Sequence, residues 1–228
     1  PDKIAVKFKD KTLTYKELNG RANQLARTLR DNGVGRETIV GLLTKRSLDM
    51  LVGIYGILKA GAAYLPIDPA NPDDRNRYIL NDSKTDYLVC QRSLADVINF
   101  QGTTIYFDDK EIDSKSTANL DNINHASDLA YIMYTSGTTG KPKGNLINQY
   151  SVCLAIKDST SIEIRSDDKF LNLSSYAFDG CIFDIFGTFL NGASLVLIEK
   201  ETLLDLDALA QVIENEKISA FFATTSLF

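Results

Sequence analysis

The chain has 228 residues, of which 44% are hydrophobic and 24% are charged, and its net charge is −5 at pH 7. These values are typical of a globular protein with a sizeable core. The negative charge argues against nucleic-acid binding, which needs a basic face. No apolar stretch approaches the roughly 18 residues of a membrane helix, and we recognise no basic membrane patch or secretory leader. We therefore expect a cytoplasmic protein with no membrane partner.

The cysteines and the single histidine predict neither a disulfide framework nor a metal site. Cys90, Cys153 and Cys181 lie far apart without CxxC spacing, which is typical of free thiols in a reducing compartment. His125 lies in a polar stretch, NINHAS, with no ligand-spaced neighbour. We interpret it as a solvated loop residue, because catalysis would need a partner.

Amphipathic helices alternate with short apolar strands along the first half of the chain. Thr14 and Glu17 form a predicted capping box at the start of a helix that ends at Gly33. Its apolar residues, at helical spacing, are Leu18, Ala22, Leu25, Ala26 and Leu29. The next expected elements are a strand over 38–43, a helix over 48–60, a strand over 63–67, a helix that begins at Asn71 and Pro72, and strands over 86–90 and 103–107.

A second alternation comes after a polar, irregular stretch over 109–127, where we place a boundary. Its expected elements are strands over 128–134, 169–173, 193–198 and 218–223, and helices over 148–158, 179–190 and 205–216. Strands separated by helices imply right-handed crossovers and mainly parallel sheets. The predicted fold class is α/β, with two lobes of mainly parallel sheets flanked by helices, approximately 1–125 and 126–228. Because the last residues come directly after a strand, we expect a fragment of a longer protein.

The most informative stretch comes after the strand over 128–134 and reads YTSGTTGKPKG. Glycines allow tight turns that bring N–H groups close to an anion, and hydroxyl and ammonium groups bind phosphate oxygens. The candidate ATP phosphate ligands are Thr135, Ser136, Gly137, Thr138, Thr139, Gly140, Lys141 and Lys143. The common loop GxxxxGK[ST] is excluded, because Thr stands at 135 and Pro at 142. A polar surface loop is the alternative.

This stretch resembles the signature of the adenylate-forming superfamily, which includes nonribosomal peptide synthetase adenylation domains, acyl-CoA ligases and firefly luciferase. Three further stretches resemble the peptide-synthetase branch, so that the resemblance covers essentially the whole chain: LTYKELNGRANQLARTLR, LKAGAAYLPIDP and FDGCIFDIFGTFLNGASLVL. One departure is Gln149, where the family often has His. The resemblance implies the N-terminal part of the adenylate-forming fold, truncated before the family's later motifs.

The resemblance implies ATP-dependent activation of an amino acid to an aminoacyl-AMP. It also implies transfer to the phosphopantetheine thiol of a peptidyl carrier protein, with neighbouring synthetase domains as partners. The cofactors implied are ATP and Mg²⁺. The magnesium ligand, the adenine and ribose contacts and the catalytic lysine belong to the later motifs, so we assign no catalytic residue and no metal ligand here. The fragment itself is therefore expected to be inactive.

Four residues match positions of the family's amino-acid pocket. By its position alone, Asp179 is explained by the helix dipole, but the resemblance implies that it binds the substrate's α-ammonium group. Gly180, Phe183 and Phe222 match selectivity positions, and the set resembles pockets for branched aliphatic amino acids, isoleucine above all. The alternative is that both phenylalanines are core residues.

Two other functions stay open. An acyl-CoA or fatty-acyl ligase of the same superfamily would share the phosphate loop but have no ammonium group for Asp179 to bind. A non-catalytic nucleotide-binding module is the alternative from a different class.

Overall fold

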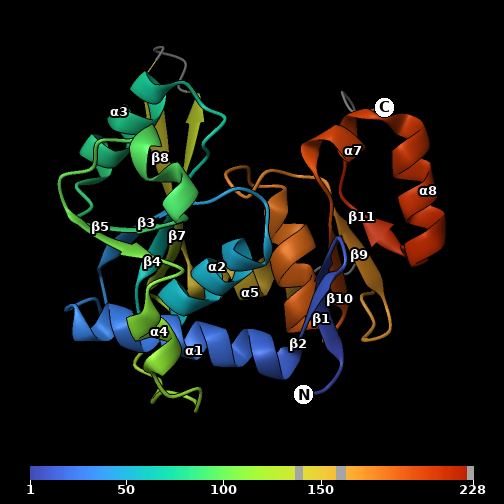
Figure 1. The fold of residues 1–228 in the computed structure, drawn as a ribbon, viewed down its shortest axis with the longest axis horizontal. Coiled ribbons are helices and arrows are strands. Elements are labelled where there is room, and N and C mark those ends of the chain that lie inside the picture. Colours follow the sequence, from blue (N-terminus) through green and yellow to red (C-terminus); the bar gives the residue numbers. More distant parts are fainter. Residues whose placement is uncertain (137–140, 158–162, 225–228) are drawn as a thin grey trace. The chain divides into compact units, whose positions relative to one another are not determined.

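The computed structural model describes residues 1–136, 141–157 and 163–224 (Figure 1). The chain forms two compact units, each assembled from separate stretches of sequence. The five-strand unit comprises Pro1–Glu17, Arg46–Leu48 and Val152–Phe228, and the six-strand unit comprises Leu18–Lys45 and Asp49–Ser151. Within the described residues, every helix is too short or too polar to cross a bilayer.

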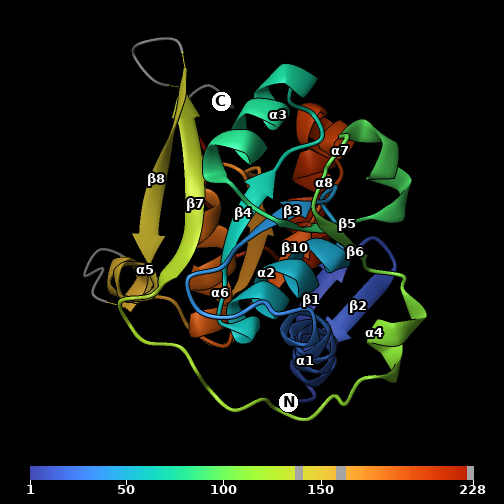
Figure 2. The same ribbon diagram turned by 90° about the vertical axis from the view of Figure 1, so that its left-hand side faces the viewer.

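The six-strand sheet has the order β6-β5-β3-β4-β7-β8 and is parallel except for the last pair. Its strands are β3 (Ile39–Leu43), β4 (Ala63–Ile67), β5 (Tyr87–Cys90), β6 (Thr103–Tyr106), β7 (Leu129–Ser136) and β8 (Pro142–Asn148). Every residue of β4 is buried, as expected for a central parallel strand covered on both faces. Figure 2 shows β7 and β8 side by side as a long hairpin.

Helices connect the strands of this sheet, and the first of them begins as the sequence predicts. The elements are α1 (Tyr15–Asp31), α2 (Leu48–Ala60), α3 (Asp73–Ser83), α4 (Lys110–Ser114) and the short 3₁₀ helix η1 (Arg92–Val97). The helix α5 (Gln149–Lys157) comes after β8 and is divided between the two units. The capping box before α1 is confirmed, because the Thr14 N–H donates to the Glu17 carboxylate at 2.7 Å and the Glu17 N–H donates to the Thr14 hydroxyl at 3.2 Å. All five predicted apolar residues of α1 are buried.

The five-strand sheet has the order β11-β9-β10-β1-β2, and only β1 and β2 are antiparallel. Its strands are β1 (Ile4–Phe8), β2 (Lys11–Thr14), β9 (Lys169–Asn172), β10 (Ser194–Leu197) and β11 (Ala220–Phe221). Its helical elements are the π-helical segment η2 (Phe183–Gly187), α6 (Thr188–Leu190), α7 (Lys200–Leu204) and α8 (Leu206–Glu216). One core cluster of this unit joins Leu171, Leu173, Val196, Ile198 and Leu209.

The predicted fold class is confirmed, since both sheets are mainly parallel and are connected by helices. The division of the chain differs from the expected lobes 1–125 and 126–228. The hairpin of β1 and β2 pairs with β10, so that the N-terminus belongs to the later sheet. The hairpin of β7 and β8 instead pairs with β4 and completes the earlier sheet.

Several local expectations were incomplete. The strands β1, β2 and β8 and the helix α7 were not predicted, and α4 lies inside the stretch 109–127 that was expected to be irregular. The helix expected over 179–190 begins at Cys181, with Asp179 and Gly180 in the preceding turn. The short helix α4 buries only Ile112, which is too little apolar signal to be recognised as a helix.

Candidate functional site

The predicted phosphate loop joins two antiparallel strands. Thr135 and Ser136 end β7 and pair with Lys143 and Pro142 of β8. Lys141 directly precedes β8 and is exposed. Four predicted ligands lie outside the described residues, namely Gly137, Thr138, Thr139 and Gly140. The flanks that the structure describes therefore place the remaining candidates at the end of one hairpin.

One face of this hairpin end carries several hydrogen-bond donors. Directly opposed residues of an antiparallel pair point to the same face, so Thr135 and Lys143 lie together, and both are exposed. Asn145 lies two residues further along the same face, and its Nδ2 donates to Thr135 Oγ1 at 3.4 Å. A hydroxyl, an ammonium and an amide in this arrangement suit phosphate oxygens. Asn145 was not predicted from the sequence, although strand alternation beyond Lys143 indicates it.

The opposite face fixes the hairpin to its own unit. The Tyr134 hydroxyl donates to Asp82 Oδ2 at 2.6 Å, and burial together with this carboxylate raises the pKa of Tyr134 above its usual range. Arg75 donates to the Tyr134 carbonyl oxygen at 3.4 Å. A Cβ atom on Gly144 would lie 3.1 Å from both the Tyr134 ring and Ile132. Glycine at 144 therefore lets the ring pack across the strand pair, and the packing holds the base of the hairpin.

The predicted amino-acid-binding residues lie near the carboxyl ends of β9 and β11, which are parallel neighbours. Open parallel sheets bind ligands at these ends of their strands. Asp179 is exposed in the turn before Cys181, and its backbone carbonyl oxygen accepts the Ile182 N–H at 3.0 Å. Phe222 comes directly after β11 and is 37% exposed.

The structure brings two of the predicted residues into contact. Gly180 is buried, and a Cβ atom on it would lie 2.6 Å from the Phe222 ring and 3.1 Å from the Phe178 ring. The space beside Gly180 is therefore filled by aromatic side chains of the chain itself. Phe183 is half-buried and packs edge-to-face on Phe170 of β9, with ring centroids 5.3 Å apart.

A buried carboxylate beside these residues was missed by the sequence analysis. Asp184 is 0% exposed. Asn172 Nδ2 donates to its Oδ2 at 3.1 Å, and the Phe222 backbone N–H donates to its Oδ1 at 3.3 Å. Burial raises the pKa of Asp184 to about 7, although these donors and the N–H groups of Ser174 and Leu173 favour the charged form. The available signal was a single carboxylate inside the apolar run CIFDIF.

The neighbouring thiol is not activated. Cys181 is buried, and its Sγ donates to the Tyr176 carbonyl oxygen at 3.5 Å. Burial, and then the charges of Asp184 and Asp179, raise the pKa of Cys181. A nucleophilic cysteine needs a lowered pKa, so this thiol does not fit that role.

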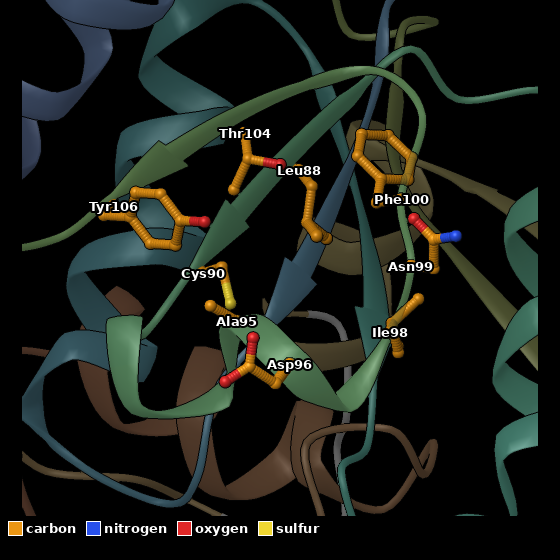
Figure 3. Close-up of a pocket in the computed structure, with 9 residues that line it drawn as sticks. All are labelled: Leu88, Cys90, Ala95, Asp96, Ile98, Asn99, Phe100, Thr104 and Tyr106. Carbon is orange, nitrogen blue, oxygen red and sulfur yellow. The ribbon is translucent and has the colours of Figure 1, made fainter.

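The six-strand unit also contains a cavity of about 310 Å³ that the sequence analysis did not predict (Figure 3). It lies among β5, β6 and η1 and is lined by Leu88, Cys90, Ala95, Asp96, Ile98, Asn99, Phe100, Thr104 and Tyr106. The predicted site residues that the structure describes do not line it. Burial raises the pKa of Cys90 to about 11, so a reactive thiolate is not indicated there.

Comparison with known proteins assigns the chain to a family. The model of the AMP-binding enzyme family matches residues 1–228. The chain is 49% identical over its whole length to bacitracin synthase 3 of Bacillus licheniformis and 43% identical to gramicidin S synthase 2 of Aneurinibacillus migulanus, and it covers 4% and 5% of those proteins. The chain therefore spans only a small part of the curated relatives that it matches.

Solved structures give the same result. A nonribosomal peptide synthetase, FmoA3, bound to alpha-methyl-L-serine-AMP matches with a TM-score of 0.88 and 31% identity, over 96% of this chain and 25% of that one. The N-terminal subdomain of Klebsiella oxytoca NpsA matches with a TM-score of 0.88 and 26% identity, over 100% of this chain and 58% of that one. The chain belongs to the AMP-binding enzyme family, as the N-terminal portion of an adenylation domain of the nonribosomal peptide synthetase type.

Proposed function

We propose that this chain is part of a domain that uses ATP to activate an amino acid as an aminoacyl-AMP. The product is then transferred to the phosphopantetheine thiol of a carrier protein within a synthetase. The observation that carries the proposal is the hairpin end, where Thr135, Lys143 and Asn145 share one face. Two structures similar to this chain are described as bound to AMPPNP and to alpha-methyl-L-serine-AMP, which supports the same nucleotide chemistry.

The chain contributes positioning and charge stabilisation to this reaction. An oxygen of the substrate carboxylate forms a bond to the α-phosphorus of ATP, and the bond to the bridging oxygen breaks, so that pyrophosphate leaves with the electron pair. Donors of the hairpin, above all Lys143, bind the β- and γ-phosphates and stabilise the charge that develops on pyrophosphate. Holding these phosphates also fixes the α-phosphorus for in-line attack.

Magnesium, when bound, would share the negative charge of the phosphates. Within the described residues, no group of three or more His, Cys, Asp or Glu side chains could hold a metal ion. The hairpin donors are suited to the phosphate oxygens rather than to the metal, so we assign no step through Mg²⁺ to this chain.

The amino acid is proposed to bind through its ammonium group to Asp179. This carboxylate is exposed, next to the buried Gly180, so a cationic substrate can reach it. Exclusion of water from this ion pair on substrate binding would strengthen the attraction. Gly180, Phe183 and Phe222 are proposed to contact the substrate side chain and to favour a branched aliphatic one such as that of isoleucine, which the contact between Gly180 and the Phe222 ring supports.

The test is amino-acid-dependent exchange of pyrophosphate into ATP, measured with the complete adenylation domain that contains this chain. Asp179→Ala is expected to abolish the exchange while ATP affinity changes by less than about twofold, because only the ammonium contact is lost. The matched control is Asp207→Ala, an exposed carboxylate on α8, which is expected to retain activity.

Three outcomes would contradict the proposal. Exchange that is stimulated by fatty acids alone would identify a fatty-acyl ligase. Nucleotide binding without exchange for any carboxylic acid would identify a non-catalytic module. An equal loss of ATP affinity and exchange in Asp179→Ala would make this residue structural.

A further inference from the structure

The carboxyl group of Asp184 joins three segments near the proposed amino-acid site. Asp184 belongs to η2, Asn172 ends β9, and Phe222 comes directly after β11. The Asn172 amide and the Phe222 backbone N–H donate to different oxygens of the same carboxyl group. One side chain therefore links the ends of two parallel strands to the helical segment above them.

We propose that Asp184 is a positioning residue of the amino-acid site, which sets the location of Phe222 and of the chain that leaves β9. It acts through these neighbours and does not touch the substrate. The inference rests on the proposed function, because it assigns a role within the same site.

Hydrogen bonding and burial together support this role. Asp184 is fully buried and, among the described residues, forms no ion pair with a basic side chain. A buried carboxyl group without a cation costs free energy, which a purely structural position would avoid with an apolar side chain. The N–H groups that surround it offset part of this cost only in the observed arrangement.

Asp184 affects substrate specificity through Phe222. Its backbone N–H is bound by Asp184, while its ring lies against Gly180. A small movement of this backbone would move the ring along the glycine and change the shape of the apolar surface beside Asp179. The π-helical turn of η2 places Asp184 toward the strand ends, and such turns are frequent at functional sites.

The decisive experiment compares Asp184→Asn with wild type in the complete adenylation domain. Asparagine has nearly the same shape but replaces one acceptor oxygen with a donor that faces other donors. We expect the KM for the preferred amino acid to rise about tenfold, while the KM for ATP changes by less than about twofold. We also expect weaker discrimination between isoleucine and smaller aliphatic amino acids. Asp207→Asn is the matched control and should leave every parameter unchanged.

A double-mutant cycle tests the route through Phe222. If Asp184 acts by holding this residue, Asp184→Asn should add little to the change in KM caused by Phe222→Leu. If Asp184→Asn does not fold, Asn172→Ser removes one donor and keeps the carboxylate, and it is expected to raise the same KM about threefold.

The results separate this inference from the proposed function. Wild type without amino-acid-dependent exchange would refute the proposed function. If the wild type is active, three results would refute the role of Asp184 alone. The first is an unchanged KM for the amino acid in folded Asp184→Asn or in Asn172→Ser. The others are equal effects of Asp184→Asn on the KM for the amino acid and the KM for ATP, and full additivity of Asp184→Asn with Phe222→Leu.

Discussion

Two buried aspartates, one in each unit, are stabilised in opposite ways. Asp128 of the six-strand unit is 3% exposed and accepts two hydrogen bonds from the Arg36 guanidinium, at 2.8 and 2.7 Å. It also accepts the His125 backbone N–H at 2.8 Å. These contacts, Arg36 first, lower the pKa of Asp128 well below its usual range. Asp184 is instead surrounded by N–H donors without an ion pair among the described residues, and burial raises its pKa to about 7.

The comparison shows how burial of a carboxylate can serve structure or function. With a bidentate cation, Asp128 stays charged at neutral pH and closes the turn before β7. Without such a partner, Asp184 lies near the balance between its two protonation states. Strongly perturbed carboxyl groups of this second kind occur often at functional sites, which agrees with its position beside the proposed substrate residues.

The largest expected effect is the pH dependence of stability conferred by Asp184. Its pKa is about 7 in the folded protein against 3.8 for the unperturbed group, so folding favours the protonated form. The contribution of Asp184 to stability is greatest below pH 3.8 and is lost as the pH rises toward 7. Asn cannot ionise, so the stability of Asp184→Asn relative to wild type should rise between pH 4 and 8, by up to about 4 kcal/mol. This pH-dependent gain adds to a pH-independent loss, because the asparagine turns a donor toward the donors of Asn172 and Phe222.

Urea unfolding of wild type and Asp184→Asn at several pH values measures this difference. Parallel stability profiles would show that Asp184 does not titrate differently in the folded state, and the contrast with Asp128 would then fail.

Asp128→Asn is expected to show the opposite pH dependence and a smaller effect. Because the pKa of Asp128 is lowered in the folded state, its stabilisation is complete above pH 3.8, the unperturbed value, and is lost as the pH falls below it. The effect is smaller because the Arg36 side chain is 43% exposed and water screens the pair. The stability deficit of the variant should thus be constant above pH 5 and shrink in acid.

The matched control for that measurement is Asp74→Asn. Asp74 pairs with Arg77 on the surface, with the Asp74 side chain 94% exposed, and such pairs contribute little. A deficit in Asp128→Asn no larger than that of Asp74→Asn would mean that the bidentate geometry adds nothing.

Elements with a strong local pattern could be predicted from the sequence. The capping box of α1 and the buried strands β4 and β7 were all recognisable from short-range spacing. Pairings between distant segments were not recognisable, because nothing local to β1 indicates that it pairs with β10. The missed strand β8 has mixed burial at a sheet edge, which weakens the alternation that predicts a strand.

The candidate site likewise contains residues that a local motif predicts and residues that only distant contacts define. Asp179 and the loop residues could be matched by motif, whereas Asp184 is defined by contacts with Asn172 and Phe222, which are 12 and 38 residues away in the chain. A polar residue in an apolar run predicts a buried hydrogen bond, but not its partners. The contact between Gly180 and the Phe222 ring was likewise beyond prediction, since glycine carries no side-chain pattern.

The smallest expected effect concerns the contact between Gly180 and the Phe222 ring, and it tests whether Phe222 can move relative to Asp184. Gly180→Ala introduces a Cβ atom 2.6 Å from the Phe222 ring, which must shift. The ring is partly exposed and can yield, so we expect a loss of only about 1 kcal/mol of unfolding free energy. Because the Phe222 N–H is bound to Asp184, the shift should also lower the amino-acid affinity.

Gly35→Ala provides the matched control, since no described residue lies within 4 Å of its added Cβ atom and neither glycine has a positive φ. Both substitutions restrict the unfolded chain similarly, by about 0.4–1 kcal/mol in favour of folding. The difference in unfolding free energy between the two variants therefore isolates the contact with Phe222. If Gly180→Ala were as stable as Gly35→Ala and bound the amino acid normally, the ring would not be confined by Gly180. Phe222 could then not transmit the influence of Asp184 to the substrate.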